Sequence, residues 1–376
     1  MTTRAESSSA TGPLTEEEAG RRDAFAERLL GAAIGMFDIF AVYLGVRLGL
    51  YRALDEGVSA TPGELARRTR CHERYVREWL EQQAVTGLLS VDDASGDAAK
   101  RRYALPREYA EVLLDRDSLN YMAPLARLIT GAVSPLPALL DVYRNGGGIS
   151  FADYGIDLRE GQSEMNRPMF LHQLPGEWLP AIADAHARLQ QAEPPARVAD
   201  VGCGAAWSAI GIARSYPNAR VDGFDLDVAS VELARQNVAE AGLAGRVDIQ
   251  LRDAGDSALA GQYDLVIALE TVHDMSRPVE ALRTMRRLVA PGGCVLVVDE
   301  RVAETFTAPG DEIERMMYGW SILHCLPAGM ADEPSAATGT VLRPATLRAY
   351  AQEAGFRDIE VLPIEHLFFR FYRLTQ

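Results

Sequence analysis

Glycines and carboxylates follow several apolar segments in the second half of the chain, in a pattern that could bind a nucleotide-like cofactor. The segment RVADV (197–201) runs into GCG at 202–204. Glycine lets a backbone approach a ligand closely, and the amides that open the following helix favour a negative group. Asp225, 25 residues after Asp200, ends the next apolar segment, where a carboxylate can accept from two ribose hydroxyls. Trp207 stands where the dinucleotide fingerprint GxGxxG requires a third glycine, so that fingerprint is incomplete.

Candidate proton acceptors follow later apolar segments. His273 and Asp274 come just after YDLVIAL (263–269), and His273 is the best candidate for a general base because an unperturbed imidazole titrates near neutrality. Asp274 would orient that imidazole. His324 is a second base or substrate ligand, and Glu300 a third candidate. The alternative is structural: His273 orders the loop and Asp274 caps the following helix.

A metal site is not predicted, although His273, Asp274 and His324 carry competent ligands. The sequence lacks a close-spaced His/Cys motif. The chain has four cysteines and no CxxC or CxxxC pair, which disfavours both a zinc knuckle and a disulfide framework. This cysteine usage fits a reducing cytoplasm, which is the expected location.

The elements that position these residues are predicted in two parts. From residue 197 onward apolar strands alternate with amphipathic helices, which predicts an α/β fold with a parallel, doubly wound sheet. Upstream, two helices and two short strands between 61 and 104 predict a winged helix-turn-helix, with Thr61 and Glu64 forming a capping box. The expected divisions are a flexible tail at 1–20, a helical and winged-helix domain at 21–191 and the sheet domain at 192–376.

The ordered set VADVGCG, GFDLD, LRDAGD, ALETVHDM and LVAPGG resembles the class I S-adenosylmethionine (SAM)-dependent methyltransferases over residues 197–300. The resemblance implies a Rossmann-like domain with a seven-stranded sheet in the order 3-2-1-4-5-7-6, whose last strand is antiparallel. It also implies a SAM site, with S-adenosylhomocysteine as product. In that site Asp200 and the glycine loop serve the methionine end, Asp225 the ribose, Leu226 and Asp253 the adenine, and Glu270 the methionine part. The implied cofactor-binding set is Asp200, Gly202, Cys203, Gly204, Asp225, Leu226, Asp253, Ala254 and Glu270.

The whole chain resembles bacterial winged-helix small-molecule methyltransferases and, more distantly, plant-type and hydroxyindole-type O-methyltransferases. We therefore expect methyl transfer to a small acceptor, with O-methylation ahead of N- or C-methylation, in specialised metabolism. Aromatic residues in the segments expected to cover the pocket suggest an apolar acceptor held by shape. They are Tyr154, Phe170, Trp178, Tyr318 and Trp320, together with Trp207. An alternative is a methyltransferase fold that binds SAM but catalyses cyclisation or rearrangement.

Charge and hydropathy bear on partners. The formal net charge is −15, and Arg74 and Arg77 of the second winged-helix segment alternate with acidic residues, which argues against nucleic-acid binding. The first 20 residues lack the apolar core of a secretion signal. The apolar stretch 29–50 contains Asp38 and Arg47, so we expect a buried or dimer-interface helix rather than a membrane span. The resemblance implies a homodimer.

Overall fold

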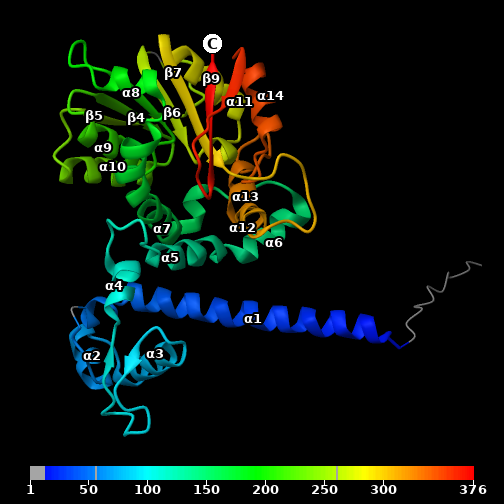
Figure 1. Ribbon diagram of the computed structural model, residues 1–376. Helices are drawn as coiled ribbons and strands as arrows, with labels where there is room; N and C mark the ends of the chain where they lie inside the picture. Colours follow the sequence, from blue (N-terminus) through cyan, green and yellow to red (C-terminus); the bar gives the residue numbers. More distant parts are fainter. Residues whose placement is uncertain (1–12, 56, 260) are drawn as a thin grey trace, which may run out of the picture. The chain divides into compact units, whose positions relative to one another are not determined.

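The computed structural model describes residues 13–55, 57–259 and 261–376, which form two compact units that divide between Ala110 and Glu111 (Figure 1). The first 12 residues of the predicted tail lie outside the described part. Helix α1 begins at Glu16, inside that predicted tail, because Thr15 and Glu18 form a capping box that starts the helix there.

The first unit contains the predicted winged helix. Thr61 accepts from the backbone N–H of Glu64, which closes the capping box, and the two wing strands pair antiparallel. The elements of this unit are α1 (Glu16–Arg47), η1 (Arg52–Leu54), α2 (Pro62–Thr69), α3 (Glu73–Val85), β1 (Ser90–Val91) and β2 (Tyr103–Ala104). Helix α4 (Arg107–Leu114) crosses the boundary between the units.

Helix α1 exposes most of its apolar surface in the isolated chain. Its C-terminal part packs on α3, where Trp79 donates its indole N–H to the Ala41 carbonyl and Gly45 leaves room for the Tyr51 and Trp79 rings. The remainder is exposed, with Phe37 63% accessible. By length and composition alone α1 could cross a membrane: an 18-residue window has a mean hydropathy of 2.0 and is only 6% buried. We expected residues 29–50 to form either a buried helix or a dimer-interface helix, and the first of these expectations is wrong for the isolated chain.

The second unit opens with helices that cross very closely. A Cβ on Gly131 of α5 would lie 2.3 Å from the Leu158 nitrogen, and one on Gly161 of α7 would lie 2.6 Å from the Leu128 nitrogen. Arg127 of α5 also pairs with Asp157 and Glu160 of α7. The elements are α5 (Ala123–Val133), α6 (Leu136–Asn145), η2 (Phe151–Tyr154), α7 (Gly155–Pro168), the π-helix η3 (Met169–Trp178) and α8 (Ala183–Leu189).

The sheet has the expected order. Its seven strands run β5-β4-β3-β6-β7-β9-β8, which is 3-2-1-4-5-7-6 when the sheet strands are counted along the chain, and β9 is antiparallel to β7. This confirms the predicted Rossmann-like fold and the terminal hairpin. The strands are β3 (Arg197–Val201), β4 (Arg220–Asp225), β5 (Val247–Leu251), β6 (Tyr263–Leu269), β7 (Val289–Glu300), β8 (Asp358–Val361) and β9 (Phe369–Thr375).

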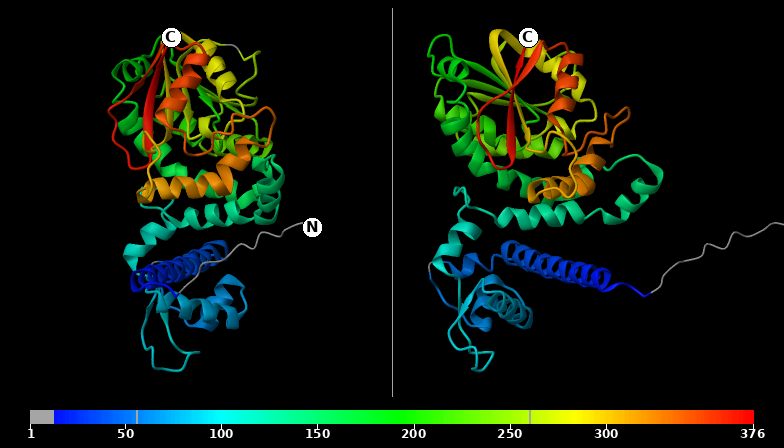
Figure 2. Two further views of the ribbon diagram at one scale, coloured as in Figure 1. Left: turned by 90° about the vertical axis from the view of Figure 1, so that its right-hand side faces the viewer. Right: turned by 45° about the vertical axis from the view of Figure 1, so that its right-hand side comes forward.

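Helices cover both faces of the sheet (Figure 2). Successive residues of β6 alternate between the two cores, Leu265 and Ile267 packing with α8, α9 and α10, and Val266 and Ala268 with α11 and α14. The elements between and after the strands are α9 (Trp207–Ser215), α10 (Val228–Glu240), η4 (Val272–Asp274), α11 (Pro278–Leu288), α12 (Glu312–Trp320), the π-helix η5 (Ser321–Cys325), α13 (Leu326–Gly329) and α14 (Pro344–Glu353).

The two compact units meet between Ala110 and Glu111, whereas the sequence analysis placed the domain boundary at 191/192. Helices α5 to α8 belong to the same unit as the sheet, because α7 and η3 pack on α9. A Cβ on Gly211 of α9 would lie 2.0 Å from the Phe170 carbonyl oxygen of η3. The helices expected to enclose a substrate thus form one body with the sheet.

The α5–α7 crossing generates a stability prediction. Gly161→Ala should lower the free energy of unfolding by about 1–3 kcal/mol, because the new methyl group must displace backbone atoms of α5. Chemical denaturation of the purified protein measures it. Gly176→Ala is the matched control, since nothing lies within 4 Å of a Cβ there. Equal unfolding midpoints for the two variants would contradict the close crossing.

Candidate functional site

A pocket of about 530 Å³ lies at the carboxyl ends of β3, β4, β5 and β6. Ligands of open α/β sheets occupy this edge. The structure brings all nine predicted cofactor residues to the pocket wall: Asp200, Gly202, Cys203, Gly204, Asp225, Leu226, Asp253, Ala254 and Glu270. The opposite wall comes from η2, α7, η3 and the segment after α13.

The loop after β3 requires its glycines. Gly202 has a φ of +72°, and a Cβ there would lie 2.3 Å from the Thr271 hydroxyl oxygen. Asp200, which precedes the loop, is 1% exposed and accepts from the Ser208 hydroxyl of α9. Burial raises the pKa of Asp200 to about 7, with a further contribution from the nearby Asp225 carboxylate and against the effect of the Ser208 bond.

Two carboxylates at the next strand ends are fixed by backbone amides. Asp225 accepts from the N–H groups of Gly204 at 2.8 Å and Asp227 at 2.9 Å, which holds it against the glycine loop. Asp253 accepts from the Gly255 N–H at 2.7 Å and from the Arg277 guanidinium at 2.8 Å. Each side chain lines the pocket, so the geometry suits the predicted contacts to ribose and adenine.

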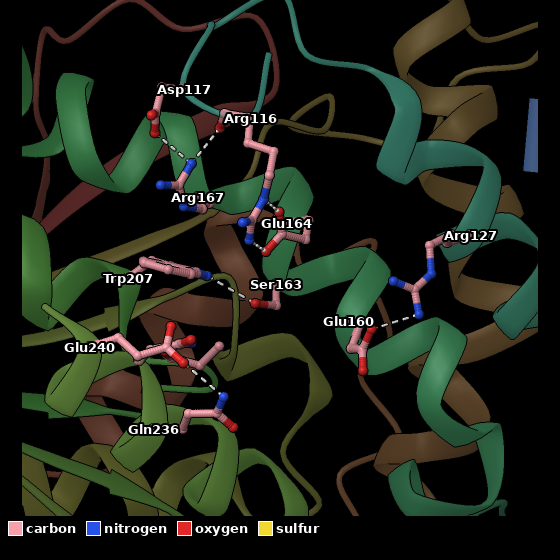
Figure 3. A network of polar contacts seen from close by, with 12 residues as sticks. Arg116, Asp117, Arg127, Glu160, Ser163, Glu164, Arg167, Trp207, Gln236 and Glu240 are labelled. Carbon is pink, nitrogen blue, oxygen red and sulfur yellow. Dashed lines mark hydrogen bonds and ion pairs between the residues drawn. The ribbon is translucent and has the colours of Figure 1, made fainter. Parts of the chain in front are cut away.

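One face of α7 completes the pocket, and the sequence analysis did not identify it. Arg159 donates to Asp227 at 2.9 Å, Asn166 donates to Glu270 at 3.2 Å, and Ser163 accepts from the Trp207 indole at 2.9 Å. Figure 3 shows the Ser163 contact together with the ion pair between Glu164 and Arg116. The available signal was helical spacing, because the pocket-lining residues Arg159, Ser163 and Asn166 lie four and three positions apart on α7.

Two carboxyl groups on the β6 side of the pocket differ in protonation. Glu270, with a φ of +53°, has one oxygen on Asn166 and the other, Oε1, buried without a hydrogen-bond partner. Burial raises the pKa of Glu270 to about 7; His273 and Asn166 oppose the shift, whereas Asp299 and Asp274 add to it. Burial also raises the pKa of Asp274, but the His273 imidazolium outweighs it and brings the value to about 2.

His273 does not line the pocket. Its ring is 3% exposed, Nδ1 donates to Asp299 at 2.8 Å, and Nε2 lies 3.2 Å from Asp274 Oδ1. Burial lowers the pKa of His273, but the two carboxylates reverse the shift and raise it well above its usual value. The imidazole is therefore a cation between two carboxylates, and of this group Asp274 is the member that borders the pocket.

The other candidate bases are also buried away from the pocket. His324 is 4% exposed, and its Nδ1 lies 3.4 Å from Cys325 Sγ; burial lowers its pKa. Glu300 is 9% exposed at the end of β7, and burial raises its pKa well above the usual value. Neither side chain borders the cavity that the described residues enclose.

Of the five predicted substrate-binding aromatics, Phe170 lines the pocket. Trp178 packs on Phe371 in the core, and Tyr154 is 2% exposed and donates to the Leu323 carbonyl. Tyr318 and Trp320 lie on α12, outside the pocket wall. Trp207 does line the pocket, as does Phe151, but polar side chains border the acceptor end beside them: Ser150, Asp153, Gln162 and Asp332. Three aromatic rings and several polar side chains therefore line this wall together, and one of the rings, Phe170, belongs to the predicted set.

Comparisons with known sequences agree with this geometry. A family model described as a methyltransferase domain matches residues 193–337, and a model described as an Rv2258c-like winged HTH domain matches residues 36–115. The ubiquinone biosynthesis O-methyltransferase of Pseudomonas aeruginosa is 30% identical over 175 residues, which are 45% of this chain and 68% of that one. The polyketide synthase ThaQ of Burkholderia thailandensis is 31% identical over 103 residues, and this chain spans 5% of its length.

Solved structures share the fold over almost the whole chain. Mitomycin 7-O-methyltransferase MmcR matches with a TM-score of 0.68 and 20% identity, over 95% of this chain and 99% of that one. Human N-acetylserotonin methyltransferase, solved in complex with SAM, matches with a TM-score of 0.62 and 19% identity, over 97% and 99%. Both matches include the helices upstream of the sheet as well as the sheet itself.

The raised pKa of Asp200 generates a pH prediction for the ligand-free protein. Between pH ~4 and ~7 the folded state keeps a proton that the unfolded state has lost, so this group makes stability fall as pH rises. Asp200→Asn removes the cost of ionising this buried carboxyl group. The variant should therefore have a free energy of unfolding ~1 kcal/mol or more above that of wild type at pH 8, and little above it at pH 4. Denaturation at both pH values measures it. Asp248→Asn, an exposed position on β5, is the control; the same response from both variants would refute the assignment.

Proposed function

This chain belongs to the SAM-dependent methyltransferases, and from that premise we propose that it transfers a methyl group from SAM to a hydroxyl group of a small-molecule acceptor. The observation that carries the proposal is the pocket at the carboxyl ends of the strands, in which nine cofactor-type residues face a wall formed by η2, α7 and the segment after α13. The relatives named as O-methyltransferases support oxygen as the acceptor atom.

The residues present fit the cofactor. Asp225 would hold the ribose hydroxyls, Asp253 the adenine amino group, and the 202–204 loop the methionine end, where a Cβ on Gly202 would collide with the Thr271 side chain. Bound there, SAM supplies a methyl group on a positively charged sulfur. The Glu270 carboxyl and the Trp207 ring both border this region and can offset that charge.

Glu270 is our proposed proton acceptor. It lines the pocket, its Oε1 has no hydrogen-bond partner, and a pKa of about 7 lets it take a proton from a hydroxyl near neutrality. Asp274 is a weaker base because its pKa is about 2. His273 acts as a positioning residue, since it touches the pocket only through Asp274.

Labelled methyl transfer tests the function. Incubation with methyl-labelled SAM and a panel of phenols, polyols, hydroxy acids and amines should label a hydroxyl compound and release S-adenosylhomocysteine. Asp225→Asn should weaken SAM binding by about tenfold or more, because a bidentate acceptor for the ribose is lost. SAM binding with rearranged product and no SAM consumption would favour cyclisation instead.

The role of Glu270 has its own test. Glu270→Gln should reduce kcat by at least ~100-fold and abolish the rise of kcat with pH through about 7. Glu164→Gln is the matched control on α7, where the side chain pairs with Arg116 outside the pocket. A weaker SAM affinity with unchanged pH dependence would assign Glu270 to the methionine group.

We propose that two copies pair through α1. Leu30, Ile34, Phe37 and Leu44 lie at spacings of three, four or seven and are each about half exposed or more, which forms a continuous apolar stripe. A stripe of this size on a free surface indicates a partner. A second copy offers the same stripe in return.

Sedimentation at low concentration checks the pairing. Wild type should sediment as a dimer and Phe37→Glu as a monomer, because a carboxylate inside an apolar interface is strongly unfavourable. Arg28→Glu lies about half a turn round the helix from Phe37 and should remain dimeric. Monomeric wild type that pellets with lipid vesicles would show instead that α1 serves a membrane.

A further inference from the structure

A buried group of metal-ligand types lies beside the pocket, outside the residues that hold the cofactor. His273, Asp274 and Cys325 each present one ligand atom, and these atoms lie within 4.8 Å of one another. The residues come from η4 and the π-helix η5, which are separated by 46 residues of sequence. Because of this separation, no close-spaced sequence motif indicates the group.

The possible ligand atoms lie against one another. Asp274 Oδ1 lies 3.2 Å from His273 Nε2, and the Cys325 thiol interacts with both residues and with Thr340. His273 and Cys325 are 3% and 7% exposed. An imidazole, a carboxylate and a thiol from two separate segments therefore meet at one buried point.

The surrounding residues are arranged as supports for metal ligands. Asp299 accepts from Nδ1 of His273 at 2.8 Å, which leaves Nε2 as the ligand nitrogen, the arrangement found around metal-bound histidines. His324 Nδ1 lies 3.4 Å from Cys325 Sγ and can donate to a thiolate. Each of the two soft or borderline ligands therefore has a neighbour that fixes its orientation or charge.

We propose that His273 Nε2, Asp274 Oδ1 and Cys325 Sγ bind one divalent transition metal ion of the zinc class. Thiolate and imidazole ligands select zinc-like ions over magnesium or calcium. A tetrahedral zinc site places its ligand atoms about 3.3–3.8 Å apart, so a pair of atoms 4.8 Å apart needs to close by about 1–1.5 Å. A fourth position remains for water or another oxygen.

The site would communicate with the pocket through Asp274, which belongs to both. An acceptor oxygen that entered beside Asp274 would be the natural occupant of the fourth position. That use rests on the proposed methyl transfer, whereas metal binding itself does not, so the two are tested by different measurements.

Cobalt(II) and zinc(II) are suitable probes. Chelator-treated wild type given Co²⁺ without oxygen should develop a thiolate-to-cobalt charge-transfer band at one equivalent, and Zn²⁺ should displace it, with about one zinc retained per chain after desalting. Cys325→Ser should lose the band. Cys294→Ser is the matched control, because Cys294 is also a free buried cysteine, 3% exposed on β7, and should keep it.

A second pair of variants keeps the proposal testable if Cys325→Ser folds poorly, which circular dichroism reports. Asp274→Asn and Asp299→Asn should each weaken zinc affinity, the latter by about 10–100-fold as a support of His273. The proposal is overturned if wild type retains only trace metal, or if Cys325→Ser keeps the cobalt band. SAM titration of the same samples reports separately on the proposed function, since full SAM binding without metal uptake would defeat this inference alone.

Discussion

The pocket depends on three side-chain contacts that attach α7 to the edge of the sheet. Arg159 reaches the turn after β4, Ser163 the start of α9, and Asn166 the end of β6. These three segments belong to separate strand-to-helix turns, and nothing in the sheet alone fixes their mutual distance. Each contact also satisfies a polar group that closure of the pocket removes from water, where an unpaired group would cost about 1–3 kcal/mol. A single helix therefore sets both the width of the pocket and the position of the Glu270 carboxyl group.

Close backbone approach makes that attachment possible. Gly131 and Gly161 bring α5 against α7, and Gly211 brings α9 against η3. The helices α7 and η3 therefore lie close enough to the sheet for the short side chains of Ser163 and Asn166 to reach its turns. A larger residue at any of these glycines would move α7 and η3 away from the sheet. Stability and pocket shape are consequently governed by the same few contacts, which explains why helices α5 to α8 form one unit with the sheet.

The sheet and its cofactor residues were predictable from sequence because the chain dictates them locally. Residues such as Asp225 and Asp253 directly follow buried strands, and the carboxyl ends of parallel strands meet at one edge. The acceptor side was not predictable in the same way. His273 and Asp274 are adjacent in the 3-10 turn η4, so one faces the Asp299 carboxylate and the other the pocket, and sequence order does not say which. Trp178 and Tyr154 pack in the core instead, as large aromatic rings usually do.

Two of the misplaced candidates, Trp178 and His324, lie on π-helices. In a π-helix the backbone bonds to the fifth residue along, so the 3.6-residue periodicity used to assign helix faces no longer applies. Cys325 ends the π-helix η5 and turns inward with His324, although adjacent residues of an α-helix point about 100° apart. Phe170 reaches the pocket from the π-helix η3 while Trp178 at its other end enters the core. In such segments a change of one residue in register decides whether a side chain meets the pocket or the core.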